Sequence, residues 1–139
     1  MRFRDEREIY ELVAEFEAAT IDRNAWKHAE HLAVALVYVV NFGEAEALEK
    51  MRSGLFILLE KGFCVDLTIE MPYHETLTVF WIKAVDRFNA ARMSASLLER
   101  ANQLIETHDK DLPLKYYTRE ALFSDEARRV FVQGDIQTL

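Results

Sequence analysis

The chain has 139 residues, of which half are hydrophobic and 29% are charged, the balance of one folded globular domain rather than of a disordered chain. Acidic residues outnumber basic ones by 24 to 17, and the net charge of -7 argues against nonspecific binding to nucleic acid or to an anionic membrane, because both need a cationic face. The single cysteine excludes an intramolecular disulfide and fits a reducing compartment. Since no apolar run reaches the ~20 residues of a membrane span and the first residues are charged, we expect a cytoplasmic protein.

Three helices are predicted in the first half of the chain. Apolar residues at helical spacing predict an amphipathic helix over 5–20. The β-branched run LAVALVYVV within 25–40 is also typical of a buried strand, but about 16 residues are long for a strand, so we predict a helix that is buried on most sides. We expect this helix to end at 41–43. A third helix is predicted over 44–61, with Gly62 as its C-terminal stop.

Residues 63–71 change to the two-residue period of a strand, with Phe63 and Val65 alternating with Cys64 and Asp66. No second run in the chain alternates as cleanly. The segment is therefore either an extended connector over the helices or a strand that pairs with its twin in a homodimer, and we favour the connector. We interpret Cys64 as a small core or interface residue rather than a nucleophile.

Helical spacing resumes after Pro72 and continues nearly to the end of the chain. The predicted helices of this half lie over 75–91, from Ser94 or Ser96 to about His108, around 114–123 and over 124–132. The sequence thus predicts an all-α, single-domain bundle of five to six helices over residues 1–139, with one extended connector at about 63–71.

Three of the four histidines closely follow an aromatic residue at a predicted helix start, in the segments WKHAEH and PYHETLT. Because residues three apart on a helix have neighbouring β-carbons, His28 and His31 can offer two imidazoles to one ion, and His74 is the candidate third ligand. Three histidines with an open fourth position hold a divalent metal such as zinc, nickel or iron that activates water. A histidine that only hydrogen-bonds a neighbour in the first turn of a helix is the simpler alternative.

Acidic and aromatic residues accompany these histidines. Glu30 and Glu75 each suit a fourth ligand, a partner that orients an imidazole, or a general base. Glu75 is also favoured in the first turn of a helix without any function. Trp26 and Tyr73 either wall a pocket beside the histidines or fasten helix ends to the core.

The chain resembles a family of small uncharacterised all-helical bacterial proteins, with the shared motifs in the same order over nearly its whole length. The motifs are Trp26-x-His28-x-x-His31-Leu32, Tyr73-His74-Glu75-Thr76-x-Thr78, and Tyr117 followed by Leu122-x-Ser124-x-x-Ala127-Arg128. The resemblance implies a shared polar site without naming its chemistry. It adds Glu75, Tyr117, Ser124 and Arg128 to the three histidines as candidate site residues. Pro72 stands where the family pattern has a glycine.

Three functions agree with these observations. The first is a metal-dependent, hydrolase-like enzyme in which the histidines hold the ion, Glu75 transfers protons, and Arg128 or Tyr117 positions the substrate. The second is a metal-free helical module that binds a small molecule or a partner and uses the histidines as polar lining. The third is a structural homodimer that pairs through 63–71. For Arg128 a surface ion pair is the simpler alternative.

Overall fold

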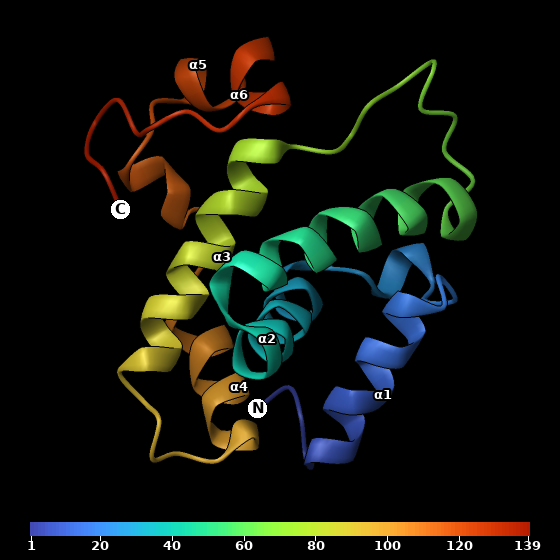
Figure 1. The fold of residues 1–139 in the computed structure, drawn as a ribbon, viewed down its shortest axis with the longest axis vertical. Coiled ribbons are helices and arrows are strands. Elements are labelled where there is room, and N and C mark those ends of the chain that lie inside the picture. The colour runs from blue at the N-terminus through green and yellow to red at the C-terminus, as the bar shows by residue number, and fades with distance from the viewer.

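The computed structural model describes all 139 residues, and it is an all-α single domain without strands (Figure 1). Its helices are α1 (Glu6–Glu17), α2 (His28–Ile57), α3 (Glu75–Ala90), α4 (Leu97–Thr107), α5 (Arg119–Leu122) and α6 (Asp125–Arg129). A 3₁₀ turn precedes α2 at Arg23–Ala25, a π turn follows it at Leu58–Gly62, and a second 3₁₀ turn lies at Leu112–Lys115. The predicted fold class is confirmed.

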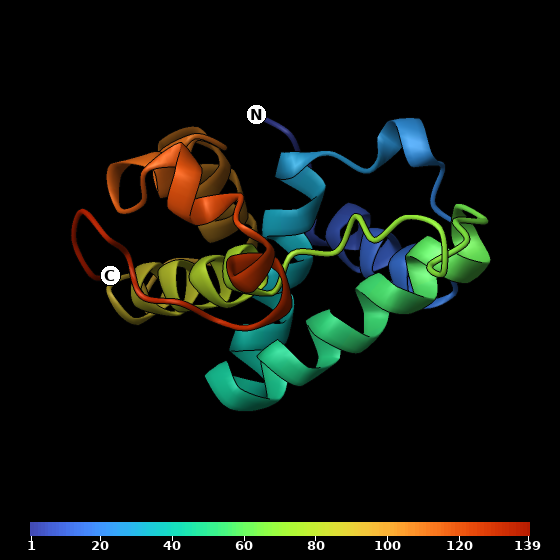
Figure 2. The ribbon, with the colours of Figure 1, turned by 90° about the horizontal axis from the view of Figure 1, so that it is seen from above.

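The first part of α2 is the central helix of the bundle. Every residue from Leu32 to Val39 is buried, and α1, α3 and α4 all pack against α2. Figure 2 shows this part between α1 on one side and α3 on the other. A helix that is apolar all round is stable only where other elements cover all its faces, and this packing outweighs the strand preference of the β-branched run. The prediction of a buried helix is confirmed here.

Gly43 bends α2 at the point where the sequence predicted that the helix would end. It has φ 81° and ψ 171°, a conformation that is essentially restricted to glycine. Helical residues continue on both sides, so α2 consists of a first arm over 28–42 and a second arm over 44–57 that runs in another direction (Figure 1). The predicted third helix is this second arm.

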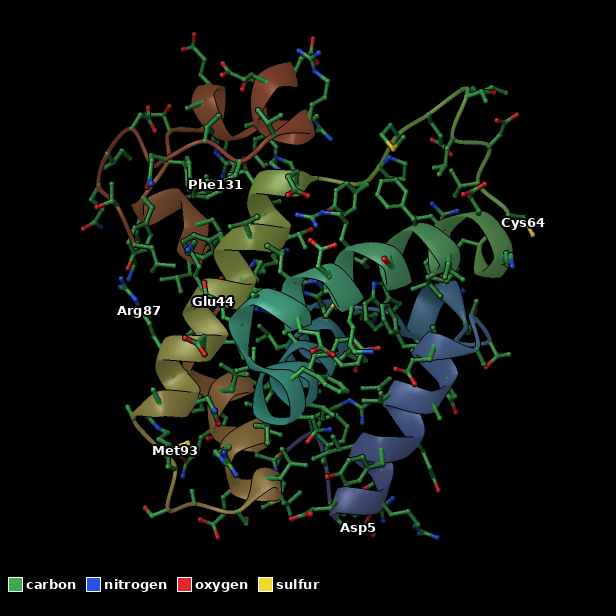
Figure 3. The ribbon with its side chains drawn as sticks, viewed as in Figure 1. Asp5, Glu44, Cys64, Arg87, Met93 and Phe131 are labelled. Carbon is green, nitrogen blue, oxygen red and sulfur yellow. The ribbon has the colours of Figure 1, made fainter.

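The connector over residues 63–74 has no regular secondary structure. The predicted alternation is lost after Asp66, because its carboxylate accepts hydrogen bonds from the Thr68 N–H (2.9 Å) and the Thr68 hydroxyl (2.6 Å) and folds the chain into a turn. Ile69 is consequently 82% exposed. Cys64 is exposed at the outer edge of the molecule (Figure 3), so its interpretation as a core residue is wrong; its φ of 56° lies in the left-handed region.

The last helix, α6, is shorter than the predicted span of 124–132. The hydroxyl of Thr76 on α3 donates a hydrogen bond to the Val130 carbonyl (3.0 Å) and accepts one from the Val132 N–H (3.1 Å). These two bonds hold the chain beyond α6 in an extended path along α3, so the helix cannot continue there.

Of the two serines predicted to cap α4, Ser96 is the N-cap, and its hydroxyl accepts a hydrogen bond from the Glu99 N–H.

By length and composition alone, the segment His28–Gly62 could cross a membrane, with a mean hydropathy of 1.3 in its most apolar window. Half of that window is buried inside the protein, and the core helix of a globular protein meets the same criterion. The criterion is therefore weak support for a membrane span. The cytoplasmic location stays a prediction.

Replacing Gly43 by alanine should lower the free energy of unfolding by about 1–3 kcal/mol, because a side chain strains this backbone conformation. An added Cβ meets no atom within 4 Å, so the loss would be conformational rather than steric. The control Asn41→Ala, at an exposed position in the preceding turn, should change the value by less than ~0.5 kcal/mol. Urea denaturation measures both, and equal stability of the two variants would contradict the role of glycine in the bend.

Candidate functional site

A pocket of about 370 Å³ lies where the start of α2, the end of its second arm, the end of the connector and the start of α3 meet. Figure 2 shows the connector crossing the bundle from the end of the second arm to the start of α3. His28, His31 and His74 all line this pocket, so the structure brings the three predicted residues to one place. Trp26 and Tyr73 also line it, as one of their two interpretations predicts, while Trp26 in addition stacks on Phe16 of α1, as the other predicts.

His74 is the N-cap of α3, and both of its ring nitrogens are engaged. Nδ1 accepts a hydrogen bond from the Leu77 N–H (3.1 Å), so Nε2 carries the proton and donates it to the Leu122 carbonyl (2.6 Å). Burial, with a smaller effect of the positive charge of Arg128, lowers the pKa of His74 below its ordinary value. The neutral ring therefore fastens the start of α3 to α5 and has no free lone pair.

His28 lies in the first turn of α2 and is engaged at one nitrogen. Its Nε2 donates a hydrogen bond to the His108 carbonyl (2.7 Å), which joins the start of α2 to the end of α4. The ring also stands edge-on to Trp81, with 4.8 Å between the ring centres. Nδ1 is the nitrogen of His28 that makes no hydrogen bond within the protein.

His31 makes no side-chain hydrogen bond within the protein, and its ring stands edge-on to Trp26 with 5.9 Å between the ring centres. Burial, and to a lesser extent the neighbouring His28, lowers the pKa of His31 to about 4. The imidazole is therefore neutral at pH 7 and offers one N–H donor and one acceptor nitrogen. Of the three pocket histidines, it is the one whose two ring nitrogens both lack a protein partner.

The donor set of the pocket does not fit the predicted three-histidine metal site. A histidine that ligates a metal does so through an unprotonated nitrogen, and His74 has none to offer without breaking the cap of α3. No group of three or more His, Cys, Asp or Glu side chains in the protein is arranged to hold a metal ion. The three histidines thus share a pocket but not a coordination geometry.

Glu75, the predicted proton-transfer residue, does not line this pocket. Its carboxylate forms a two-pronged ion pair with Arg52, with distances of 3.0 Å from Nε and 2.5 Å from Nη2, and it accepts a hydrogen bond from the Tyr73 hydroxyl (2.5 Å). The Arg52 guanidinium lowers the pKa of the Glu75 carboxyl. The carboxylate is therefore ionised at neutral pH, and it links the second arm of α2 to α3.

The remaining candidates lie outside the histidine pocket. The Tyr117 hydroxyl donates a hydrogen bond to the Val132 carbonyl (2.5 Å). Tyr117 lines a separate cavity of about 200 Å³ together with Phe131, which is labelled in Figure 3. Ser124 caps α6 through the Ala127 N–H (3.1 Å). Arg128 stands 5.9 Å from the ring centre of Phe123 and forms no ion pair. None of these three residues lines the histidine pocket, although Arg128 is close enough to His74 for its charge to lower the pKa of that residue.

Sequence reasoning missed one wall of the pocket. The side chains of this wall come from the second arm, the π turn and the start of the connector: Leu55, Leu58, Leu59 and Phe63. The spacing of the three leucines is typical of the apolar stripe of a core helix, and Phe63 begins the alternating segment. Nothing in this spacing indicates a cavity. Lys27, the charged residue of the lining, was missed as well; its position directly before His28 was the available signal.

Comparisons with models of protein families, with curated proteins and with solved structures found no match to this chain. The resemblance drawn from the three sequence motifs therefore stays a prediction.

The low basicity of His31 predicts a particular loss of stability in acid. The unfolded chain binds a proton at this residue below about pH 6.5 and the folded protein only near pH 4, so the free energy of unfolding falls as the pH decreases through this window. We expect a loss of about 2 kcal/mol from His31, reduced from the full effect because solvent reaches the pocket.

Urea denaturation of the wild type and of His31→Gln at pH 7 and pH 4.5 measures this loss, since glutamine does not titrate. Contributions from His74 and His108, whose pKa values burial also lowers, occur in both proteins and cancel in the comparison. The wild type should lose about 1–2 kcal/mol more than the variant. Equal losses would contradict the burial of a neutral imidazole at this position.

Proposed function

We propose that the histidine pocket binds a small apolar molecule and that it does so without a metal ion. The observation that carries this proposal is His31, a neutral imidazole with two unpartnered ring nitrogens in a cavity of about 370 Å³. Small-molecule sites are typically concave, mostly apolar and equipped with a few polar groups that orient the ligand. His31 is such a polar group.

The walls of the pocket support an apolar ligand. Trp26 and Trp81 supply large aromatic surfaces, and Leu55, Leu59 and Leu77 are partly exposed to the cavity. Burial of such apolar surface by a ligand stabilises the complex by a free energy of ~25 cal/mol per Å². A hydroxyl, amide or carboxyl group on the ligand would in addition meet the donor or the acceptor of His31.

The hydrolase-like alternative has less support. It requires His74 to give up either the hydrogen bond to the Leu122 carbonyl or the one from the Leu77 N–H, each of which fixes a helix end. It also requires Glu75 to leave its ion pair with Arg52 before it can take a proton. The alternative of a homodimer through the connector is independent of the pocket and stays a prediction.

Both tryptophans of the protein line the pocket, so their fluorescence reports on a bound ligand. We expect at least one of three probes, 4-ethylphenol, 4-ethylbenzamide and 4-ethylbenzoate, to change this fluorescence saturably with a dissociation constant of about 0.1–1 mM. An excess of EDTA should leave the dissociation constant unchanged. A loss of binding in EDTA that zinc restores would contradict a metal-free site.

Filling the pocket provides the matched test of location. Leu59→Phe places a larger side chain in the lining and should weaken binding at least about fivefold. Ile57→Phe adds the same ring two residues earlier, at an exposed position outside the lining, and should leave binding unchanged. Equal effects of the two substitutions, or the absence of binding by all three probes, would overturn the proposed function.

A further inference from the structure

The lining of the histidine pocket carries charge of one sign only. Lys27 is the one formally charged residue in it, and neither an aspartate nor a glutamate lines the pocket. None of the ion pairs of the protein involves Lys27, which lines the pocket and is exposed, so its ammonium group is unpaired and in contact with water. An uncompensated cation beside an apolar cavity stands out in a protein with a net charge of -7.

Two helices begin at this pocket. Lys27 is the N-cap of α2 and His74 is the N-cap of α3, and the first turn of a helix carries a positive partial charge. The carboxylates in these first turns are already compensated: Glu30 accepts hydrogen bonds from the Lys27 N–H (3.0 Å) and from Arg2 (2.7 Å), and Glu75 is held in its ion pair. Neither carboxylate lines the pocket. The positive potential at the pocket is therefore not cancelled from within.

We propose that the ligand is a monocarboxylate with an aromatic or branched aliphatic body, an inference that rests on the proposed function. The apolar body contacts the indole rings of Trp26 and Trp81, which both line the pocket. The carboxylate lies beside Lys27, which pairs with it and remains in contact with water. Affinity comes mainly from the body, and the single ammonium selects for one negative charge.

The same arrangement disfavours other classes of ligand. A primary amine would place a second positive charge beside Lys27 and the two helix N-termini. A phosphomonoester or a dicarboxylate brings a second negative charge, for which the lining has no further cation, and removing that charge from water without a partner is unfavourable. A neutral molecule of the same shape gains the apolar contacts but not the pairing with Lys27.

Titration of the full chain with 4-ethylbenzoate and 4-ethylbenzamide tests the inference, because the two probes share one shape and differ in charge. Tryptophan fluorescence should show that the wild type binds the benzoate about fivefold more tightly than the benzamide, the upper end for a solvent-exposed ion pair. Lys27→Gln should remove this preference and Lys27→Glu should reverse it, while the affinity for the benzamide changes less than about twofold. Circular dichroism verifies that each variant is folded.

Lys61→Glu is the matched control, since Lys61 is an exposed lysine on the π turn that does not line the pocket. It should keep the full preference for the benzoate. Equal affinities of the wild type for the two probes, or a preference that survives Lys27→Glu, would overturn the carboxylate assignment and leave the proposed pocket standing. Binding of neither these probes nor 4-ethylphenol would defeat the proposed function itself.

Discussion

The first arm of α2 presents apolar side chains on all its faces, and the need to cover every one of them organises the rest of the fold. α1, α3 and α4 pack around it, and the bend at Gly43 turns the second arm away from this crowded axis. The far end of the second arm, with the π turn behind it, then lies next to the start of the first. The pocket forms at this edge of the core, where the continuous packing ends.

The histidines differ in role because their hydrogen-bonding surroundings differ. One nitrogen of His74 caps the first turn of α3, and the other bonds α5. One nitrogen of His28 bonds the end of α4 and so links it to the start of α2. A neutral imidazole can bridge two helix ends in this way, because one ring nitrogen donates a hydrogen bond and the other accepts one. His31 is free of this task. It lies one turn further along α2, lines the pocket and makes no side-chain hydrogen bond within the protein.

Much of the fold follows from sequence pattern, whereas much of the site does not. Apolar periodicity and capping serines located the longer helices, but the predicted helix around 114–123 is a 3₁₀ turn followed by the short α5. The hypothesis that His28, His31 and His74 share a site predicted that they lie close together. The hydrogen-bonding partners of these side chains could not be predicted from spacing, because they are distant in the sequence. Arg52, which pairs with Glu75, lies 23 residues before it, and the Leu122 carbonyl, which accepts from His74, lies 48 residues after it. Spacing along a chain shows which groups can meet a ligand. It does not show which of them are already engaged with the protein.

A pocket lined by large rings persists only if its walls cannot collapse into it, and here the indoles are fixed by other aromatic groups. Trp26 stacks on Phe16 with 4.9 Å between the ring centres, and Trp81 is held by the rings of Phe80 and His28 at 5.2 and 4.8 Å. Because these contacts are made within the protein, the walls are already ordered before a ligand binds. Binding then loses less side-chain conformational entropy, which usually opposes association. The two tryptophans are therefore fixed walls of the pocket, which the unpartnered ring of His31 also lines.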